Sequence, residues 1–287
     1  MKITEIITGG KPSLSFEIFP PKTATNFPNV RQVAEEIASL QPNFMSVTYG
    51  AGGGTSEFTA DLSAYIQEAY HVPTLAHLTC VSSSEGKIRD VLDQLKRKGI
   101  ENVLALRGDI PQGFDIHTAS YHHASDLISV IRNSHNFCIG GACYPEKHPE
   151  SESFKADLNH LKTKVESGCE FLTSQMFFDN NIFYNFLYRL RDAGIRVPVI
   201  AGIMPVTNAS QIRRIMAISG SVLPPRFARL VERYGDDPAS MQQAGIIYAT
   251  AQILDLYANG VDAVHVYTMN KPEVARQIMG NLTGIIR

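Results

Sequence analysis

A single carboxylate, Glu17, interrupts the apolar stretch LSFEIFPPK that runs from residue 14 to residue 22. The stretch has the composition of a buried β-strand, so its one acidic side chain is expected to lie out of water. Burial disfavours the ionised carboxylate and raises its pKa, at a cost of about 1.4 kcal/mol per unit. A carboxyl group held neutral in this way can serve as a general acid. A structural ion pair with lysine or arginine fits the spacing equally well, and a metal ligand is a third role.

The motif ALRGD, residues 105–109, is the second stretch that could do chemistry. Gly108 would let the backbone approach a flat ligand, and Arg107 offers a rigid fork of hydrogen-bond donors. Asp109 can accept a hydrogen bond from a ring nitrogen or an amine. A turn with a local pair between Arg107 and Asp109 is the alternative.

The sequence contains no recognisable motif for binding a metal ion and no glycine-rich dinucleotide-binding fingerprint. His122 and His123 are adjacent at an expected exposed helix start, and neither HExxH nor Cys–His ligand spacing occurs. The segment GAGGGT, residues 50–55, resembles a dinucleotide fingerprint, but its third glycine would fall at Thr55 and no suitable acid follows. We predict no metal site, and we interpret 50–55 as a mobile loop over the barrel mouth.

The elements that must position these residues follow from periodicity, because short apolar stretches alternate with longer segments of helical spacing. Strands are expected at residues 14–20, 44–50, 73–80, 102–109, 137–145, 171–178, 197–205 and 263–270. Helices are expected at 30–41, 57–71, 85–98, 121–134, 152–168, 180–194, 208–219, 224–234, 238–259 and 273–283. This alternation implies parallel strands joined by helical crossovers.

We therefore predict an α/β fold, a (β/α)8 TIM-type barrel with extra helices before the last strand. One domain spans residues 1–287, since no linker divides the chain. A doubly wound sheet is the main alternative. A barrel gathers its active site at the carboxyl ends of the strands. Polar residues expected there are Glu17, Thr48, Tyr49, His77, Thr79, Arg107, Asp109, Tyr144, Gln175, Tyr267, Thr268 and Asn270.

The amino-acid composition and net charge limit the kinds of molecule that the protein is expected to bind. Hydrophobic residues make up 44% of the chain and charged residues 19%, which is typical of a globular fold. The net charge is −2 and no lysine–arginine block occurs, so we expect neither nucleic acid nor membrane as a partner. The four cysteines form no CxxC pair, and neither a signal peptide nor an eighteen-residue apolar segment is evident, which favours the cytoplasm.

Six segments, in order SFEIFPPK, SVTYGAGG, AHLTC, ALRGD, YPEKHPE and SQMFFD, resemble the bacterial methylenetetrahydrofolate reductases. The resemblance extends from about residue 13 to residue 271. It implies a flavin-binding barrel enzyme with FAD as cofactor, which NAD(P)H reduces. The enzyme then converts 5,10-methylenetetrahydrofolate to 5-methyltetrahydrofolate in a ping-pong reaction, supplying methyl groups for methionine synthesis. The alternative is a non-catalytic or partner-dependent barrel subunit that binds flavin and folate.

The same resemblance implies roles for individual residues. Glu17 would protonate the folate bridge so that it opens to an iminium, and Asp109 would lie near the flavin and pterin rings. Expected FAD contacts are Thr48, Tyr49, Ala51, His77, Arg107, Gly108, Asp109, Ala124, Tyr144, His148, Asp157, His160 and Lys164. Expected substrate contacts are Glu17, Asp109, Gln175, Gln211, Tyr267 and Lys271.

Several positions depart from the family pattern. His160 and Thr163 stand where enteric relatives carry asparagine and arginine, and an arginine-to-threonine change removes up to five donors from a phosphate pocket. Ile215 replaces a phenylalanine near nicotinamide and folate, and Lys271 replaces an arginine. NADH, NADPH and an electron-transfer partner protein all remain open as the donor. Apolar faces on the helices at 224–259 lead us to expect a homo-oligomer.

Overall fold

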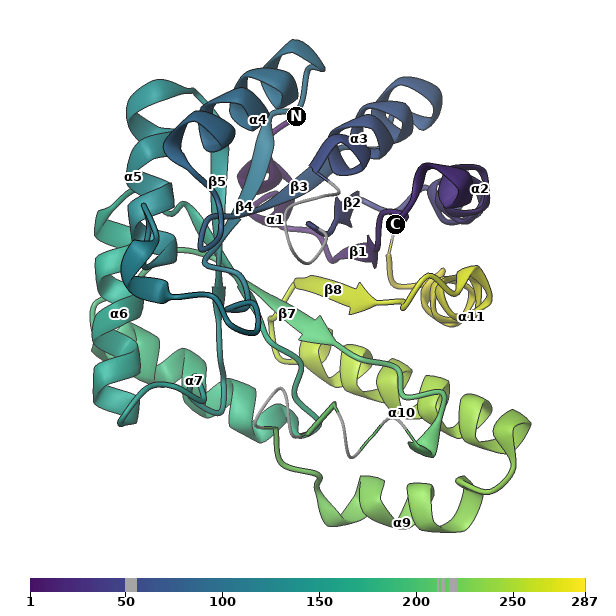
Figure 1. Ribbon diagram of the computed structural model, residues 1–287. Helices are drawn as coiled ribbons and strands as arrows, with labels where there is room; N and C mark the ends of the chain where they lie inside the picture. Colours follow the sequence, from purple (N-terminus) through teal and green to yellow (C-terminus); the bar gives the residue numbers. More distant parts are fainter. Residues whose placement is uncertain (50–55, 211, 213–214, 217–220, 287) are drawn as a thin grey trace.

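A closed barrel of parallel strands forms the centre of the computed structural model, which describes residues 1–49, 56–210, 212, 215–216 and 221–286 (Figure 1). The strands are β1 (Ser13–Ile18), β2 (Phe44–Val47), β3 (Thr74–Thr79), β4 (Asn102–Leu106), β5 (Cys138–Cys143), β6 (Phe171–Ser174), β7 (Val199–Ile203) and β8 (Ala263–Tyr267). Each pairs with the next in parallel, and β8 pairs with β1 to close the barrel. The predicted (β/α)8 barrel is confirmed.

Helices surround the barrel, and most follow the expected ranges closely. They are α2 (Phe27–Ala38), α3 (Ser56–Tyr70), α4 (Glu85–Arg97), α5 (Ala124–Ser134), α6 (Phe154–Glu166), α7 (Asn180–Asp192), α9 (Pro225–Tyr234), α10 (Pro238–Ala258) and α11 (Pro272–Leu282). The extra helices before the last strand are α9 and α10, and Figure 1 shows α9 outside α10 on the side of β7 and β8. The helix expected at 208–219 and the loop expected at 50–55 fall wholly or partly outside the described residues.

The short helix α1 (Ile3–Ile7) was not predicted from the sequence. Its buried Ile3 and Ile7 pack against inward-facing residues at the amino ends of the strands, among them Phe44, Leu75 and Phe171. Two short 3-10 turns, η1 (Ala24–Asn26) and η2 (Ile116–Thr118), were also missed. Among the described helices, none is both long and apolar enough to span a lipid bilayer.

Alternation along the strands decides which side chains face the barrel interior. In β1, Leu14, Phe16 and Ile18 pack outward in the cluster that includes residues of α2 and α11. Ser13, Ser15 and Glu17 occupy the alternate positions and therefore point inward. The register sets Glu17 opposite Ser46 of β2 on one side and opposite Tyr267 of β8 on the other. Polar side chains of three adjacent strands thus meet inside the barrel.

Most strands end earlier than expected, so several predicted site residues lie in loops. Strand β4 ends at Leu106, and Arg107, Gly108 and Asp109 follow it. Gly108 adopts φ +88°, a left-handed conformation in which no strand can continue. After β8, Met269 and Asn270 have φ of +54° and +56° and end that strand in the same way. The predicted residues keep their place at the carboxyl ends, on loop backbone instead of strand.

Candidate active site

Glu17 is a buried acid near the centre of the barrel, with a relative exposure of 7%. Burial raises its pKa to about 8. Its Oε2 lies 3.7 Å from Nε2 of His77 and 4.0 Å from Nε2 of His265. Burial lowers the pKa of each imidazole to about 3, so both are neutral at physiological pH. No arginine or lysine among the described residues pairs with Glu17, which favours a protonated acid over a structural ion pair.

Two serines and a histidine extend from this acid and were missed by sequence reasoning. The Ser46 hydroxyl lies 2.8 Å from Nε2 of His265. Its interaction with the Glu17 carboxyl lowers the pKa of that group, against the larger effect of burial. Nδ1 of His265 lies 2.7 Å from the hydroxyl oxygen of Ser15. The sequence did mark His265 as unusual, because it is the one polar residue in the apolar stretch AVHVY. Its neighbours across the barrel are 219 and 250 residues away in sequence, which periodicity cannot reveal.

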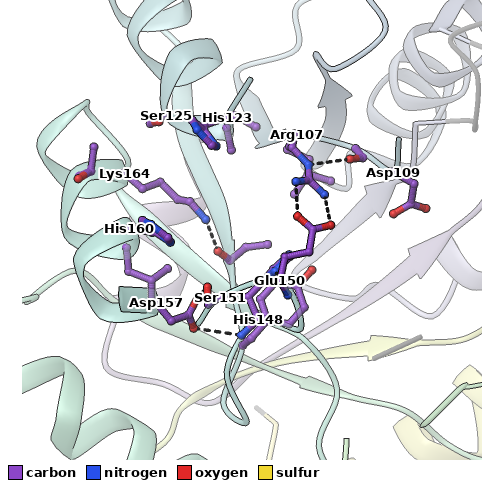
Figure 2. Close-up of a pocket in the computed structure, with 18 residues that line it drawn as sticks. Arg107, Asp109, His123, Ser125, His148, Glu150, Ser151, Asp157, His160 and Lys164 are labelled. Atoms are coloured by element: carbon purple, nitrogen blue, oxygen red, sulfur yellow. Dashed lines mark hydrogen bonds and ion pairs between the residues drawn. The ribbon is translucent and has the colours of Figure 1, made fainter. Parts of the chain in front are cut away.

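A cavity of about 440 Å³ lies at the carboxyl ends of β4 and β5, against the first turn of α5 and along α6 (Figure 2). Nine of the residues that the resemblance assigned to FAD line it. They are Arg107, Gly108, Asp109, Ala124, Tyr144, His148, Asp157, His160 and Lys164. The described residues on the cavity wall also include Thr163, Glu150, Ser151, His123 and Ser125.

The other predicted contacts lie apart from this wall. Thr48 and Tyr49 follow β2, and His77 lies beside Glu17. The Tyr267 hydroxyl donates to the Ser174 carbonyl at 2.6 Å, and Lys271 donates to the Thr207 hydroxyl at 2.6 Å. Gln175 follows β6, and its side-chain oxygen accepts from the Met176 N–H at 2.9 Å. Ala51 and Gln211 lie outside the described residues.

Arg107 and Glu150 form a two-point ion pair on one side of the cavity (Figure 2). The guanidinium nitrogens lie 2.5 and 2.7 Å from the two carboxylate oxygens. The hydrogen bond with Glu150 raises the pKa of Arg107 and lowers that of the carboxyl. Glu150 stands within the quoted motif YPEKHPE, but its partner is 43 residues away. The local Arg107–Asp109 pair considered from the sequence is replaced by this longer-range pair.

The opposite wall, on α6, carries a lysine and a carboxylate (Figure 2). Nζ of Lys164 donates to the Ala142 carbonyl at 2.5 Å, and burial lowers the pKa of the amine. Asp157 accepts from the Ser151 hydroxyl at 2.9 Å and from the His148 N–H at 3.2 Å. A cation suits a phosphate group and a fixed carboxylate suits ribose hydroxyls. This donor set, with the Tyr144 ring beside it, fits a dinucleotide cofactor such as FAD.

Replacing Gly108 with alanine should destabilise the protein by about 2–4 kcal/mol. The left-handed backbone strains any Cβ, and a Cβ at Gly108 would also lie 2.8 Å from Cβ of Thr79. Gly113 is the matched control, because it has φ +79° and no neighbouring atom within 4 Å of an added Cβ. Gly113→Ala should therefore lose only about 1 kcal/mol. Thermal melts of both variants measure the difference, and equal losses of stability would contradict the steric argument.

Comparison with known proteins identifies the family. A family model described as methylenetetrahydrofolate reductase matches residues 2–283. The chain is 33% identical over 273 residues to the 5,10-methylenetetrahydrofolate reductase of Escherichia coli K12, covering 95% of this chain and 91% of that protein. It is 34% identical over 295 residues to methylenetetrahydrofolate reductase (NADH) 1 of Arabidopsis thaliana, covering 98% of this chain. It spans only about half the length of that plant relative, of which 50% is covered.

A solved structure from Clostridium thermocellum supports the fold. That protein, described as uncharacterized and as binding two copies of 5-methyl-5,6,7,8-tetrahydrofolic acid, superposes with a TM-score of 0.69. The comparison covers 99% of this chain and all of that one, at 14% sequence identity, a level that carries the fold alone. The family rests instead on the family model and on the bacterial relatives. By these two findings, the chain belongs to the methylenetetrahydrofolate reductase family.

Proposed function

We propose that this protein is an FAD-dependent methylenetetrahydrofolate reductase that uses NAD(P)H to form 5-methyltetrahydrofolate. The observation that carries the proposal is Glu17, a carboxyl group buried in the barrel with a pKa of about 8. It has two neutral imidazoles beside it and no cationic partner among the described residues. A barrel of this family with a protonated carboxyl at its centre can supply the proton that folate reduction consumes.

In this proposal Glu17 donates its proton to the nitrogen of the folate bridge, and the carbon–nitrogen bond opens to an iminium at the other nitrogen. The iminium carbon then accepts a hydride, so the folate gains one hydride and one proton. Bound FAD would carry that hydride from the nicotinamide to the folate. Asp109 would place a negative charge beside the reacting rings, and Gln175 and Tyr267 would orient the folate.

The cavity would hold the cofactor. Lys164 would face the phosphates, Asp157 the ribose hydroxyls, and Gly108 would let the ring system approach the backbone. We infer that nicotinamide and folate take turns at one barrel mouth, which would give ping-pong kinetics. We also infer that the barrel is a single catalytic domain in the cytoplasm and that its product supplies methyl groups for methionine synthesis. NADH is the first donor to test, because the Arabidopsis relative is named for it.

An anaerobic spectral titration tests this function. The purified protein, reconstituted with FAD, should lose its flavin absorbance when NADH is added and recover it when methylenetetrahydrofolate follows. A flavin that binds but stays oxidised with NADH, and bleaches with NADPH or a reduced partner protein, would change the donor only. A protein that cannot be loaded with FAD would contradict the proposal and favour a non-catalytic barrel.

Replacing Lys164 with methionine should weaken FAD binding about 10- to 100-fold, the range expected for one charge-assisted hydrogen bond. Methionine keeps much of the apolar stem, which lies over Gly141, and removes only the cation. Lys162→Met is the matched control, since Lys162 lies on the same helix and is exposed. Titration of apoprotein with FAD at low and high salt gives both affinities. Equal affinities for the two variants would show that Lys164 does not face the phosphates.

A further inference from the structure

The guanidinium of Arg107 is held by Glu150 on the wall of the cavity (Figure 2). Its two terminal nitrogens lie 2.5 and 2.7 Å from the two carboxylate oxygens, and Nε donates to the Gly108 carbonyl at 3.2 Å. A guanidinium fork of this kind binds the oxygens of a carboxylate or of a phosphate at two points. An anion-binding group of the cavity is therefore already engaged by an acid of the same chain.

The two partners of this ion pair differ in how far they lie out of water. The Glu150 side chain is 57% exposed, whereas that of Arg107 is 24% exposed. A pair with so exposed a partner is weak, because water solvates the carboxylate almost as well as the guanidinium does. Glu150 can therefore turn into solvent at little cost, while Arg107 keeps its bond to the Gly108 carbonyl.

The charges around the cavity make this pair important for an anionic ligand. The charged side chains among the described residues that line it are Arg107, Lys164, Asp109, Glu150 and Asp157. The acids outnumber the cations, and the pyrophosphate of FAD is itself an anion. Lys164 bonds to a backbone carbonyl, so Arg107 is the cation of the two whose charge is offset by a direct acidic partner.

We propose that Glu150 competes with the FAD pyrophosphate for Arg107 and so lowers the affinity of the protein for its cofactor. That FAD is the cofactor rests on the proposed function. As FAD binds, phosphate oxygens would take over the guanidinium and the Glu150 carboxylate would turn into solvent. Lys164 and Arg107 would then approach the pyrophosphate from different walls of the cavity (Figure 2).

Titration of the apoprotein with FAD tests this competition. Glu150→Gln keeps the size of the side chain and removes its charge, so it should bind FAD about 3- to 10-fold more tightly than the wild type at low salt. Because the carboxylate is exposed, the gain should shrink to about twofold or less in about 1 M salt. Unchanged or weaker binding at low salt would overturn the proposal, since the acid would then leave Arg107 available or hold it where the cofactor needs it.

Glu152→Gln is the matched control for the change in charge. Glu152 is an exposed acid of the same loop and is not on the cavity wall. Its replacement alters the net charge by the same amount, but the affinity for FAD should stay at the wild-type value. An equal gain in both variants would mean that the general field of the loop sets the affinity, which would overturn the proposal.

Arg107→Met removes the group for which the two anions compete. Glu150→Gln should tighten FAD binding in the wild-type background and have no effect in the Arg107→Met background, a coupling that a double-mutant cycle measures. A gain of the same size in both backgrounds would show that Glu150 acts on the cofactor without Arg107. That result would also overturn the proposal.

Riboflavin separates the phosphates from the ring system, because it carries the same ring without a phosphate. The wild type and Glu150→Gln should bind riboflavin equally, and a gain as large as that for FAD would overturn the pyrophosphate as the competing group. Uptake of FAD without reduction of methylenetetrahydrofolate would refute the proposed function and leave these affinities valid. If neither the wild type nor Glu150→Gln takes up FAD, both proposals fall.

Discussion

If Glu17 acts as in the proposed function, Glu17→Gln should slow the reduction of methylenetetrahydrofolate by about 10²- to 10⁴-fold, the usual contribution of a general acid. Glutamine has nearly the same shape and suits a buried site, but its amide cannot give up a proton to the folate nitrogen. In the proposed reaction the transfer of hydride from NADH to the flavin requires no proton from Glu17, so that half-reaction should keep close to its wild-type rate. Anaerobic stopped-flow measurement of the two half-reactions separates these effects.

Two results of this experiment would contradict the role of Glu17 as the acid. An equal loss in both half-reactions would mean that the substitution disturbs the flavin site, since the Glu17 proton is needed in only one of them. Unchanged folate reduction would mean that another group supplies the proton. Tyr267 is poorly suited to that task, because burial raises its pKa well above the ordinary value and its proton is held by the Ser174 carbonyl.

The folate half-reaction should also fall about tenfold per pH unit above pH 8, or about a hundredfold between pH 8 and pH 10. The pKa of Glu17 is about 8, so the acid is protonated below that value and loses its proton above it. Reduction of the flavin by NADH should lack this dependence. Both rates are measured from pH 6 to pH 10 in the wild type and in Glu17→Gln.

The control in this pH series is the variant itself. Glu17→Gln has no carboxyl to titrate, so its residual folate rate should be flat where the wild-type rate falls. A wild-type rate that already falls tenfold per pH unit from pH 6 upward, as expected for a glutamate with the ordinary pKa of 4.5, would show that Glu17 is solvated during turnover. The neutral histidines add no step in this range, because burial lowers the pKa of both to about 3.

The barrel was predictable because the same sequence pattern, an apolar stretch followed by a helical segment, is repeated along the chain. Eight apolar stretches separated by helical segments leave few arrangements, and all eight strands were found close to their expected positions. The strand ends were set too late, since apolar composition continues past the residue where a left-handed backbone such as Gly108 stops the pairing. Helix α1 is five residues long, too short to show a helical period, although it fills the amino end of the barrel.

The site was predictable only in part. Glu17 was conspicuous because a charge inside an apolar strand needs a reason, and the motif around Arg107 lies on the wall of a cavity, while its role in binding stays a prediction. Its partner Glu150 and the imidazole of His265 were missed. Their contacts join segments 43 to 250 residues apart, and only closure of the barrel brings them together. Sequence spacing carries no information on such pairs.

The buried acid with its two imidazoles also ties the folding equilibrium to proton concentration. Unfolding releases the proton of Glu17 whenever the pH exceeds its ordinary pKa of 4.5, so the stability that this group contributes declines as the pH rises to about 8. The imidazoles act oppositely: unfolded histidines bind protons below pH 6.5, and their contribution is lost as the pH falls towards 3. Each group changes the free energy of unfolding by about 1.4 kcal/mol per pH unit. Between pH 4.5 and 6.5 the two imidazoles outweigh the one carboxyl, so stability rises with pH. Above pH 6.5 only the carboxyl still acts, so stability falls. The three residues together place their best folding conditions near pH 6.5, so the arrangement that keeps a proton ready for chemistry also restricts the range in which the barrel is most stable.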